Sequence, residues 1–519
     1  MTFLLLLSLL SLLSLSLFQN SGATLSGTFI DCGALVGSTI DGIRWLPDTD
    51  YVGSGTPKNI TANVTVETLS TVRSFPKELN RKFCYEVPVF RGARYMVRAT
   101  YYYGGVNGYN SPPVFDQMVD GTFWGVVNTT ADYEQGLSSY YEGVFLAQGK
   151  TMSVCIGSNN YTDSDPFISA LEFVALEDSV YNATDFSQHV LSLVSRTSFG
   201  YNGTDIIKYP DDEFNRYWEP FRDNAHMDTI AGNNNVSVSG FWNLPPKKIF
   251  DMALASGPEQ PMEFIWPPVL LANSNYCIAL YFADNPDSVL DGGSRTFDIF
   301  INHVPYYRNL TVKPDGAVVF AKEWPLSGAT NITLNSVAGS NKGPLINGGE
   351  IFHVLDLGRR TLTRDVIALD EFKKSLQNPP LDWNGDPCLP QQYTWTGLTC
   401  SYERRVRVVT LNLTNMGLSG TLSPNISRLS ALNSILLGNN SFSGMIPDLS
   451  PLSKLEKLHL EDNRFSGEIP QSLGNIPGLR ELFLQNNNLT GEIPSSLLNK
   501  SELNLKTSPG NQLSSPPPS

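Results

Sequence analysis

Hydrophobic and polar residues alternate with a period of two through most of the first two thirds of the chain. The alternation is clear in Arg94-Tyr-Met-Val-Arg-Ala-Thr-Tyr101, in Thr151-Met-Ser-Val-Cys-Ile156 and in Phe167-Ile-Ser-Ala-Leu-Glu-Phe173. Such runs, rich in β-branched and aromatic residues and separated by Gly, Asn, Asp and Pro, predict short β-strands. Helical periodicity is nearly absent before Leu357. Many short strands with long loops favour β-sandwiches over a single barrel.

Two markers of this region occur a second time, in the same order and at similar spacings. The first is an aromatic strand that leads to a Phe-Asp pair, and the second is a proline six residues before a glutamate. They lie at Tyr95, Asp116, Pro166 and Glu172, and again at Tyr276, Asp298, Pro344 and Glu350. We therefore expect two copies of one sandwich, residues 24–180 and 195–357, with a short connecting helix between Asp185 and Val194.

A different period begins at Val408. Units of the form L-x-L-x-x-N-x-L/F-x-G follow one another, and their final glycines are 24, 23 and 24 residues apart: Gly420, Gly444, Gly467 and Gly491. The leucines are predicted to pack between coils, and three asparagines to satisfy backbone groups at the turns: Asn440, Asn463 and Asn487. Met416 replaces the asparagine in the first unit, and a degenerate fifth coil ends near Gly510-Asn511. This is the leucine-rich repeat in its plant extracellular form, so residues 408–513 should form a short solenoid.

The segment between the two patterns, residues 363–407, is predicted to cap the solenoid, because the first hydrophobic layer of a repeat stack must be covered. Apolar residues at helical spacing predict an amphipathic helix between Thr363 and Gln377: Val366, Leu369, Phe372 and Leu376. Thr363 or Asp365 is expected to cap the start of this helix, and Pro379-Pro380 to end it.

Two tryptophans and two cysteines complete the predicted cap. Trp383 and Trp395 should fill the space between the helix and the first repeat. Cys388 and Cys400 lie twelve positions apart beside these tryptophans. We expect them to form a disulfide that closes a small loop over the end of the solenoid.

Residues 1–23 have the pattern of a secretory signal sequence. From Thr2 to Phe18 they are mostly Leu and Ser without charge, and Ser21-Gly-Ala23 supplies small residues for cleavage. The alternative is an uncleaved anchor, because no basic residue precedes the long hydrophobic run. No later window of eighteen apolar residues occurs, so we do not expect the rest of the chain to span a membrane. Residues 514–519 form a Pro/Ser tail, and the protein is either secreted or an ectodomain cut before its anchor.

An extracellular route permits disulfides and N-linked glycans. Outside the cap, Cys32, Cys84, Cys155 and Cys277 can pair in three ways, and we favour the one that joins Cys84 to Cys155. Fourteen N-x-S/T sequons predict a heavily glycosylated surface: Asn59, Asn63, Asn128, Asn160, Asn182, Asn202, Asn235, Asn309, Asn331, Asn412, Asn425, Asn439, Asn488 and Asn499. The net charge of −14 argues against nucleic acid and anionic lipid as partners.

Several stretches of the first two thirds carry a resemblance: Phe29-Ile-Asp-Cys-Gly33, Val72-Arg-Ser-Phe-Pro76, Cys84-Tyr85, Tyr95 to Tyr103, Pro166-Phe-Ile-Ser-Ala-Leu-Glu172, Tyr209-Pro-Asp-Asp212 and Arg295-Thr-Phe-Asp298. They resemble the tandem malectin-like region of plant receptor-like kinases and receptor-like proteins. The resemblance implies two malectin-type sandwiches packed against each other, a lectin-like fold at the plant cell surface.

Together with the repeats, Gly385-Asp-Pro-Cys388 resembles the ectodomain of the symbiosis receptor-like kinase group. The chain contains no kinase, which suggests a kinase-less receptor-like protein instead. In that group the motif is implicated in release of the malectin-like part from the repeats. The resemblance therefore implies a processing motif at Gly385, Asp386, Pro387 and Cys388, where a flexible Asn-Gly step lies beside a rigid Asp-Pro step. The alternative is a purely structural motif.

An aromatic strand end runs into a glycine-rich loop at Tyr101-Tyr-Tyr-Gly-Gly-Val-Asn-Gly-Tyr109. Animal malectin binds glucose disaccharides through aromatic residues and an aspartate in comparable loops, although fold alone does not fix a site. The predicted ligand contacts are Tyr101, Tyr102, Tyr103, Asn107, Tyr109 and Asp116. The alternative places these tyrosines in the core, because strand geometry sends Tyr101 and Tyr103 to one face and Tyr102 to the other.

Three acidic clusters have the residues of a glycosidase or calcium site: Asp163-Ser-Asp165, Asp211-Asp-Glu213 and Asp284-Asn-Pro-Asp287. Hydrolysis needs two carboxyl groups at a set separation across one sugar, whereas turn chemistry explains Asp and Asn beside Pro and Gly. No zinc spacing, phosphate-binding glycine loop or nucleophile elbow occurs, and His226, His303, His353 and His459 are scattered. We expect no catalytic residues, metal or cofactor.

In the repeats, the residues beside the buried leucines face the open side of the solenoid. Leu436, His459 and Phe483 occupy equivalent positions in successive units, after the sequon Asn412 in the first. An exposed apolar column of this kind favours protein docking, and the alternative is ordinary surface variation.

The sequence thus predicts a mainly β protein with tandem malectin-like sandwiches and a short leucine-rich-repeat solenoid behind a helical cap. Its predicted function is non-catalytic recognition at the plant cell surface. The sandwiches would bind cell-wall carbohydrate or a secreted peptide, and the repeats would recruit a partner receptor. The alternative class is a secreted carbohydrate-active or structural wall protein, which turnover of a sugar on a glycan array would reveal.

Overall fold

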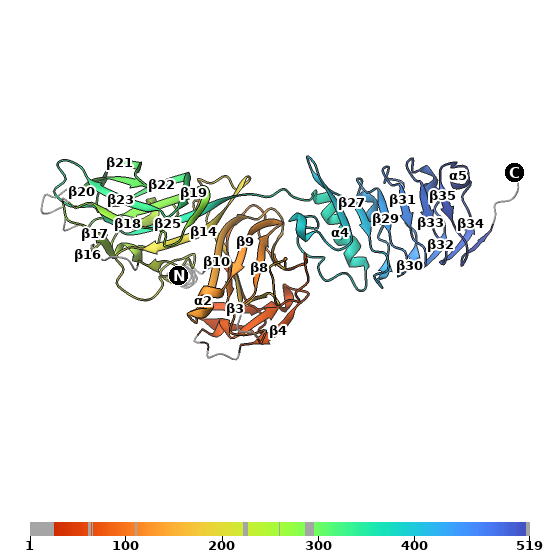
Figure 1. The fold of residues 1–519 in the computed structure, drawn as a ribbon, viewed down its shortest axis with the longest axis horizontal. Helices are drawn as coiled ribbons and strands as arrows, with labels where there is room; N and C mark the ends of the chain where they lie inside the picture. Colours follow the sequence, from red (N-terminus) through yellow and green to blue (C-terminus); the bar gives the residue numbers. More distant parts are fainter. Residues whose placement is uncertain are drawn as a thin grey trace, which may run out of the picture.

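The computed structural model describes residues 25–60, 64, 66–108, 112–221, 227–258, 260–285 and 295–514. The molecule is elongated, with two adjoining β-sandwiches at one end and a solenoid at the other (Figure 1). The cap of the solenoid rests against the first sandwich, although the chain reaches it from the second. This mainly β architecture confirms the predicted fold class.

The first sandwich encloses its core between the first strands of a large sheet and a four-stranded sheet of order β6-β11-β8-β9. Its elements are β1 (Gly27–Asp31), β2 (Ser38–Ile40), β3 (Ile43–Pro47), η1 (Asp48–Asp50), β4 (Thr56–Asn59), η2 (Glu67–Leu69), β5 (Thr71–Ser74), β6 (Lys82–Pro88), β7 (Arg94–Tyr101), β8 (Val114–Val119), β9 (Thr122–Asn128), α2 (Thr130–Glu134), β10 (Ser139–Leu146), β11 (Thr151–Gly157), β12 (Phe167–Ile168) and β13 (Ala170–Leu176).

The second sandwich repeats this plan, with a four-stranded sheet of order β18-β23-β20-β21 opposite the other end of the large sheet. Its elements are β14 (His189–Ser198), β15 (Glu219–Pro220), β16 (Asp228–Ala231), η3 (Val238–Gly240), η4 (Lys247–Phe250), β17 (Met252–Ala255), β18 (Met262–Ile265), β19 (Leu271–Phe282), β20 (Arg295–Ile301), β21 (Val304–Val312), β22 (Ala317–Gly328), β23 (Asn331–Ser336), β24 (Leu345–Ile346) and β25 (Gly348–Asp356).

One continuous sheet runs through both sandwiches, in the order β2-β3-β1-β13-β7-β10-β14-β25-β19-β22. β10 and β14 join the two halves as antiparallel neighbours, with Val144 opposite Leu191. The predicted connecting helix is therefore wrong, because most of the segment from Asp185 to Val194 lies in β14. This strand pairs with β25 from His189 to Ser198, and that distant partner decides its conformation.

The two copies inferred from the sequence correspond strand for strand. Glu172 in β13 lies next to β7, and Glu350 in β25 lies next to β19, so each marker glutamate falls in the same pair of strands. Each sandwich has its own apolar core, and a third apolar cluster lies between them. The domain limits themselves stay a prediction. β14 begins at His189, between the predicted ranges 24–180 and 195–357.

The cap and repeats form one apolar core behind two parallel sheets, of order β27-β29-β31-β33-β35 and β28-β30-β32-β34-β36. Their elements are α4 (Thr363–Ser375), η5 (Gln391–Tyr393), β26 (Leu398–Tyr402), β27 (Val406–Asn412), β28 (Ser419–Thr421), η6 (Pro424–Arg428), β29 (Ser434–Leu436), β30 (Ser441–Met445), β31 (Lys457–His459), β32 (Arg464–Glu468), η7 (Gln471–Asn475), β33 (Glu481–Phe483), β34 (Asn488–Glu492), α5 (Ser495–Leu498), β35 (Asn504–Lys506) and β36 (Gln512–Ser514).

The predicted cap helix is α4, but its start differs from the prediction. Leu362 occupies the N-cap position and no side chain caps the helix. Asp365 instead accepts hydrogen bonds from Arg407 at 2.8 Å and from the Val408 backbone N–H at 3.2 Å, which ties the helix to β27. Both cap tryptophans are buried and stack with ring centroids 5.2 Å apart, so they fill the space beneath the helix as predicted.

The repeat asparagines satisfy the backbone as their spacing predicts. The Asn440 side-chain amide donates to the carbonyls of Leu413 and Leu437 at 2.8 and 3.0 Å, and its oxygen accepts from the Leu418 N–H at 2.9 Å. Asn511 makes equivalent contacts in the fifth coil. β35 and β36 therefore continue both sheets, and the degenerate coil is part of the solenoid.

Candidate functional site

The residues beside the buried leucines line up across the parallel sheet of the solenoid. Strand registers place Asn412 beside Leu436, Leu436 beside His459, and His459 beside Phe483. Lys506 extends the row at the fifth coil. The positions that the sequence singled out are therefore neighbours in space, and we call Leu436, His459, Phe483 and Lys506 the solenoid column.

Contacts within the column hold Phe483 in place. The His459 ring stacks on it with centroids 4.2 Å apart, and the Lys506 ammonium lies 4.2 Å from its centroid. His459 also lies 2.8 Å from a Glu481 carboxylate oxygen, and Lys457 pairs with the same carboxylate at 2.9 Å. The hydrogen bond from Lys457 holds the pKa of Glu481 below its ordinary value. The column thus presents half-buried apolar and aromatic side chains with charged groups beside them.

The aromatic loop of the first sandwich is mostly turned inward. Tyr101 is completely buried and donates its hydroxyl to a buried glutamine at 3.0 Å. Tyr103 is also buried, and its hydroxyl donates to Asn107, whose amide donates to a serine at 2.7 Å. Tyr102 is half-buried. The structure therefore places Tyr101 and Tyr103 in the core, the alternative that strand alternation left open.

Asp116, another predicted ligand contact, binds protein groups. Its Oδ2 atom accepts from the Tyr393 hydroxyl at 2.7 Å and from the Gln392 amide at 2.9 Å, and its Oδ1 atom accepts from the Tyr161 hydroxyl. Two of these donors belong to the cap. Asp116 thus joins the first sandwich to the cap, and its carboxylate is occupied by protein donors. Tyr109 lies outside the described residues.

The Gly-Asp-Pro-Cys motif lies against the outer face of the first sandwich. Gly385 has φ +64°, and a Cβ atom there would come within 2.9 Å of both sulfurs of the Cys84–Cys155 disulfide. The Asp386 carboxylate accepts from the backbone N–H groups of Cys388 and Leu389 at 2.9 and 3.0 Å, which fixes the turn. Only glycine fits both the conformation and the close approach. We call this contact between residues 382–393 and the first sandwich the clasp.

Lys82 and Arg81 hold the clasp from the sandwich side. The buried Lys82 ammonium donates to the backbone carbonyls of Asp386 and Leu389, both at 2.5 Å, and Arg81 pairs with Asp382 at 2.9 Å. Burial lowers the pKa of Lys82 to about 8, although the negative charges of Asp386 and Asp382 oppose the shift. The motif is therefore bound on several sides, and Pro387 and Cys388 are buried.

The two sandwiches meet across a row of buried charges of alternating sign. Glu172, Arg98, Glu142, Arg196 and Glu350 come from neighbouring strands of the continuous sheet, β13, β7, β10, β14 and β25. The ion pairs along this row measure 3.0, 2.7, 2.7 and 2.7 Å, and the side chains are at most 2% exposed. We call the row the charge ladder.

The glutamates of the ladder differ in the direction of their pKa shifts. Burial by itself raises the pKa of Glu142, but the flanking charges of Arg196 and Arg98 hold that pKa below its ordinary value. Glu172 ends the row beside Arg98, and there burial prevails and raises its pKa. The ionised Glu142 carboxylate therefore forms ion pairs with two arginines, Arg98 from the first sandwich and Arg196 from the second.

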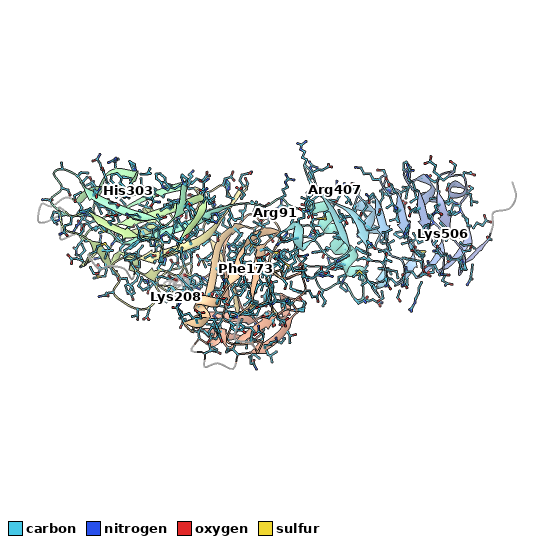
Figure 2. The ribbon with its side chains drawn as sticks, in the orientation of Figure 1. Arg91, Phe173, Lys208, His303, Arg407 and Lys506 are labelled. Atoms are coloured by element: carbon cyan, nitrogen blue, oxygen red, sulfur yellow. A yellow bond between two sulfur atoms is a disulfide. The ribbon has the colours of Figure 1, made fainter. Side chains whose placement is uncertain are left out.

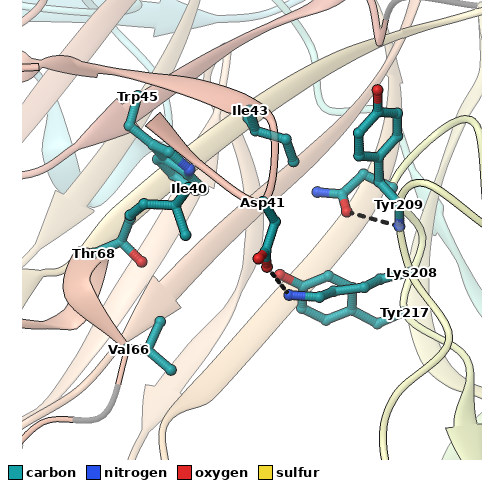
Figure 3. A pocket seen from close by; sticks show the side chains of 10 residues that line it. Ile40, Asp41, Ile43, Trp45, Val66, Thr68, Lys208, Tyr209 and Tyr217 are labelled. Atoms are coloured by element: carbon teal, nitrogen blue, oxygen red, sulfur yellow. Dashed lines mark hydrogen bonds and ion pairs between the residues drawn. The ribbon is translucent and has the colours of Figure 1, made fainter. Parts of the chain in front are cut away.

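A pocket opens where the sandwiches meet at the surface (Figure 3). Ile43 and Trp45 from β3 line one side and Tyr217 the other, and Lys208 pairs with Asp41 across it at 2.9 Å. Its volume is about 70 Å³. Small-molecule sites usually measure roughly 300–1,000 Å³, so this pocket is too small for a disaccharide.

One aspartate in each of two acidic clusters makes structural contacts, and Asp287 lies outside the described residues. Asp212 accepts from Arg216 and Trp218 at 2.9 and 2.8 Å, and Asp284 accepts from Arg295 at 2.9 Å. Within the described ranges no three His, Cys, Asp or Glu side chains form a group that could hold a metal ion.

The structure contains disulfides between Cys84 and Cys155 and between Cys388 and Cys400, whereas Cys32 and Cys277 are buried thiols. Glycan attachment stays a prediction. Asn63 lies outside the described residues, and among the remaining sequons the exposed asparagines are Asn59, Asn128, Asn160, Asn182, Asn202, Asn235, Asn309, Asn412, Asn439, Asn488 and Asn499.

The malectin-like domain family matches residues 30–354, well over half of the chain. The chain belongs to this family. The leucine-rich repeat N-terminal domain matches residues 362–401, and the leucine-rich repeat itself matches residues 454–476 and 478–499. These families are ectodomain types and not catalytic ones, so the chain has the architecture of a receptor-like ectodomain of the malectin-like and leucine-rich-repeat kind.

Two Arabidopsis thaliana proteins illustrate the relatives. The leucine-rich repeat receptor-like serine/threonine-protein kinase At2g14510 is 28% identical over 442 residues, which cover 81% of this chain and 49% of that protein. The probable LRR receptor-like serine/threonine-protein kinase At1g67720 is 29% identical over 454 residues, which cover 80% and 46%. The chain thus spans about half the length of the curated relatives it matches. In the described part of the chain no helix is both long and apolar enough to cross a bilayer.

Solved structures share the fold of the first two thirds. The ANX2 ectodomain from Arabidopsis thaliana gives a TM-score of 0.53 at 16% identity, covering 63% of this chain and 97% of that one. A chain from the structure of the plant peptide RALF23 in complex with FER and LLG2 gives a TM-score of 0.52 at 16% identity, covering 64% and 96%. At these identities the likeness shows a common fold and nothing further.

Proposed function

We propose that this chain is a non-catalytic recognition ectodomain of the plant cell surface, whose malectin-like pair binds a secreted peptide and whose repeats recruit a partner receptor. The solenoid column carries the proposal. Its aromatic and apolar side chains lie in register on an open parallel sheet, and Phe483 is fixed between His459 and Lys506. A rigid aromatic anchor bordered by charge is typical of the few residues that dominate binding energy in protein interfaces.

Three observations favour a peptide over a carbohydrate ligand. Tyr101 and Tyr103 are buried, Asp116 is bound to the cap, and the pocket between the sandwiches is small. The FER complex with the peptide RALF23 and LLG2 supports the same arrangement, since a malectin-like neighbour there assembles with a peptide and a second protein.

Site-directed crosslinking tests the recruiting surface. A photo-crosslinking amino acid at Phe483 in the full chain on plant cells should capture a receptor ectodomain, and the same amino acid at the exposed Met445 should not. The captured ectodomain is then purified and its affinity measured by calorimetry. We expect Leu436→Glu with Phe483→Glu to weaken binding at least ten-fold.

The matched control replaces two exposed apolar residues on other faces, Met445→Glu with Leu498→Glu, and should leave the affinity unchanged. Full affinity in the column variant would reject this surface. A glycan array with the wild type and Tyr102→Ala tests the ligand class, because sugar binding that the variant loses would replace the peptide in the proposal.

Processing at the Gly-Asp-Pro-Cys motif is a separate proposal for the same chain. Release of the malectin-like part there requires the clasp to open first, because the motif is partly buried and held by Lys82. Gly385→Ala should loosen the clasp and increase fragmentation of the expressed protein. An unchanged fragment pattern in Gly385→Ala and in Asp386→Ala would leave the motif a structural role alone.

A further inference from the structure

A basic groove lies at the cap end of the solenoid, separate from the solenoid column. Its lining comes from the β26–β27 hairpin, from β27 and from the residues just before β29 and β31: Ser401, Glu403, Arg404, Arg405, Arg407, Val409, Ala431 and Lys454. The groove measures about 510 Å³, within the roughly 300–1,000 Å³ of ligand sites. Figure 2 shows Arg407 of the groove near the cap and Lys506 of the column near the far end of the solenoid.

The cations of the groove differ in how far they are neutralised. Arg407 is held by the Asp365 carboxylate at 2.8 Å, which fixes the floor of the groove. Arg404, Arg405 and Lys454 are exposed, and none of them forms an ion pair within the described ranges. Against them stands one lining carboxylate, Glu403. The groove therefore keeps a net positive charge, because its exposed cations outnumber its one carboxylate.

Two further arginines hold the β26–β27 hairpin in place. Arg359 donates to the backbone carbonyls of Tyr402 and Glu403, and Arg364 donates to Ser430 beside the groove. The hairpin that carries Arg404 and Arg405 is thus anchored to the linker before the cap. A fixed hairpin presents its guanidinium groups without the entropy loss that a free loop would incur on binding.

The charge distribution of the whole chain makes the groove distinct. The net charge is −14, but residues 363–514 carry 13 Lys and Arg against 14 Asp and Glu, so the acidic excess lies almost entirely in the malectin-like part. An anionic ligand is therefore repelled by the sandwiches and attracted to the groove. Guanidinium groups bind carboxylates through paired hydrogen bonds, which suits a row of acidic side chains.

We infer that this groove binds an acidic peptide segment of an extracellular protein. Several cations spread over an open groove fit successive carboxylates of an extended chain better than one small anion. The site goes beyond the solenoid column, because it uses other residues and another kind of contact, and each can fail without the other.

The test uses the purified full chain and a fluorescein-labelled peptide of five Glu-Ser repeats, with five Gln-Ser repeats as the neutral probe. Fluorescence polarisation at 50 mM NaCl should show binding of the acidic probe alone, weakening at 300 mM NaCl. Arg404→Glu with Arg405→Glu should weaken binding at least ten-fold. Leu436→Glu with Phe483→Glu should bind the acidic probe as the wild type does.

The matched control reverses two exposed arginines of later coils, Arg464→Glu with Arg480→Glu, and so changes the net charge equally. Equal losses in the two arginine variants would show general charge attraction and overturn the assignment, as would equal binding of the neutral probe. Complete displacement by millimolar sulfate, at an ionic strength where chloride has no effect, would assign the groove to a single anion and contradict the peptide. A folded groove variant, checked by circular dichroism, that keeps wild-type affinity would also contradict it.

Discussion

The molecule contains two junctions between its parts, and they are built differently. The sandwiches share a continuous sheet, and five buried charges cross their junction in alternating sign. Among the described residues the first sandwich and the repeats share no strand. Their clasp includes a glycine against a disulfide, a lysine bonded to two carbonyls, and the Arg81–Asp382 ion pair. The first junction is part of the fold of each sandwich, whereas the second joins two surfaces through side-chain and loop contacts.

The difference shows where the molecule can change shape. Opening the first junction would break the β10–β14 pairing and leave arginines buried without partners, which is costly in a low-dielectric interior. Opening the clasp would expose a small apolar cluster of Cys84, Cys155, Met118 and Tyr393 and release polar groups to water. The clasp is therefore the junction at which the orientation of the repeats can change while both sandwiches stay folded.

The largest effect is expected from breaking the charge ladder at its centre. Glu142→Gln removes the negative charge that Arg98 and Arg196 share, and should lower the free energy of unfolding by about 3–5 kcal/mol. Urea denaturation followed by tryptophan fluorescence measures this. The control is Glu219→Gln, since Glu219 is exposed and its carboxylate accepts from the Tyr140 hydroxyl at 2.7 Å, with an expected loss below about 1 kcal/mol. Similar losses in both variants would contradict the contrast between buried and exposed charge.

The next effect concerns the clasp. Gly385→Ala forces alanine into a left-handed conformation and against the disulfide, and should destabilise the docked cap by about 2–4 kcal/mol. Calorimetry should show the solenoid transition at a lower temperature and the malectin-like transition unmoved. Gly92→Ala separates the two causes, because Gly92 has φ +85° with nothing within 4 Å, so that only the strain applies. A joint shift of both transitions in Gly385→Ala would mean that the two junctions unfold together.

A third prediction uses pH on the same clasp. The pKa of Lys82 is about 8 in the folded protein and roughly 10.4 in an unfolded chain. Between these values the unfolded state binds more protons, so folding stability should rise with pH through this window and stay flat below it. Relative to Lys82→Met, the wild type should gain about 2 kcal/mol from pH 8 to pH 10. The exposed Lys77→Met should show no such slope, and a constant or falling difference for Lys82→Met would reject the burial argument.

The smallest effect lies at the surface of the first junction. Asp41 and Lys208 join the two sandwiches across the pocket, with side chains 58% and 44% exposed. Asp41→Asn should cost below about 1 kcal/mol, and less in high salt, because water screens the pair. A loss as large as that of Glu142→Gln would show that the exposed pair, and not the ladder, holds the sandwiches together.

The solenoid could be predicted from its sequence because its contacts are local. The Asn440 amide donates to the Leu413 carbonyl of the preceding coil, only 27 positions earlier, so the repeat pattern itself brings the two partners together. β14 could not be predicted in the same way, since its partner β25 lies about 150 residues later. A short amphipathic run without its partner is compatible with helix or strand, and the helix was the wrong choice.

The candidate site shows the same division. Strand alternation correctly put Tyr101 and Tyr103 on one face, but whether that face was the core depended on other strands. Asp116 is bound by Tyr393, 277 positions later, and no local pattern indicates that contact. Glu172 and Glu350 were recognised only as markers of the duplication. The ladder could have been predicted from these two glutamates, because each lies in an apolar strand, where a buried charge requires a partner of opposite charge.

Amide hydrogen exchange on the wild type and Gly385→Ala tests most directly the claim that the clasp is the separable junction. In the wild type, residues 382–393 and the β10–β14 pair should both be protected. In Gly385→Ala we expect residues 382–393 to exchange much faster while β10 and β14 keep their wild-type protection. Loss of protection in both regions, or an unprotected clasp in the wild type, would contradict the account.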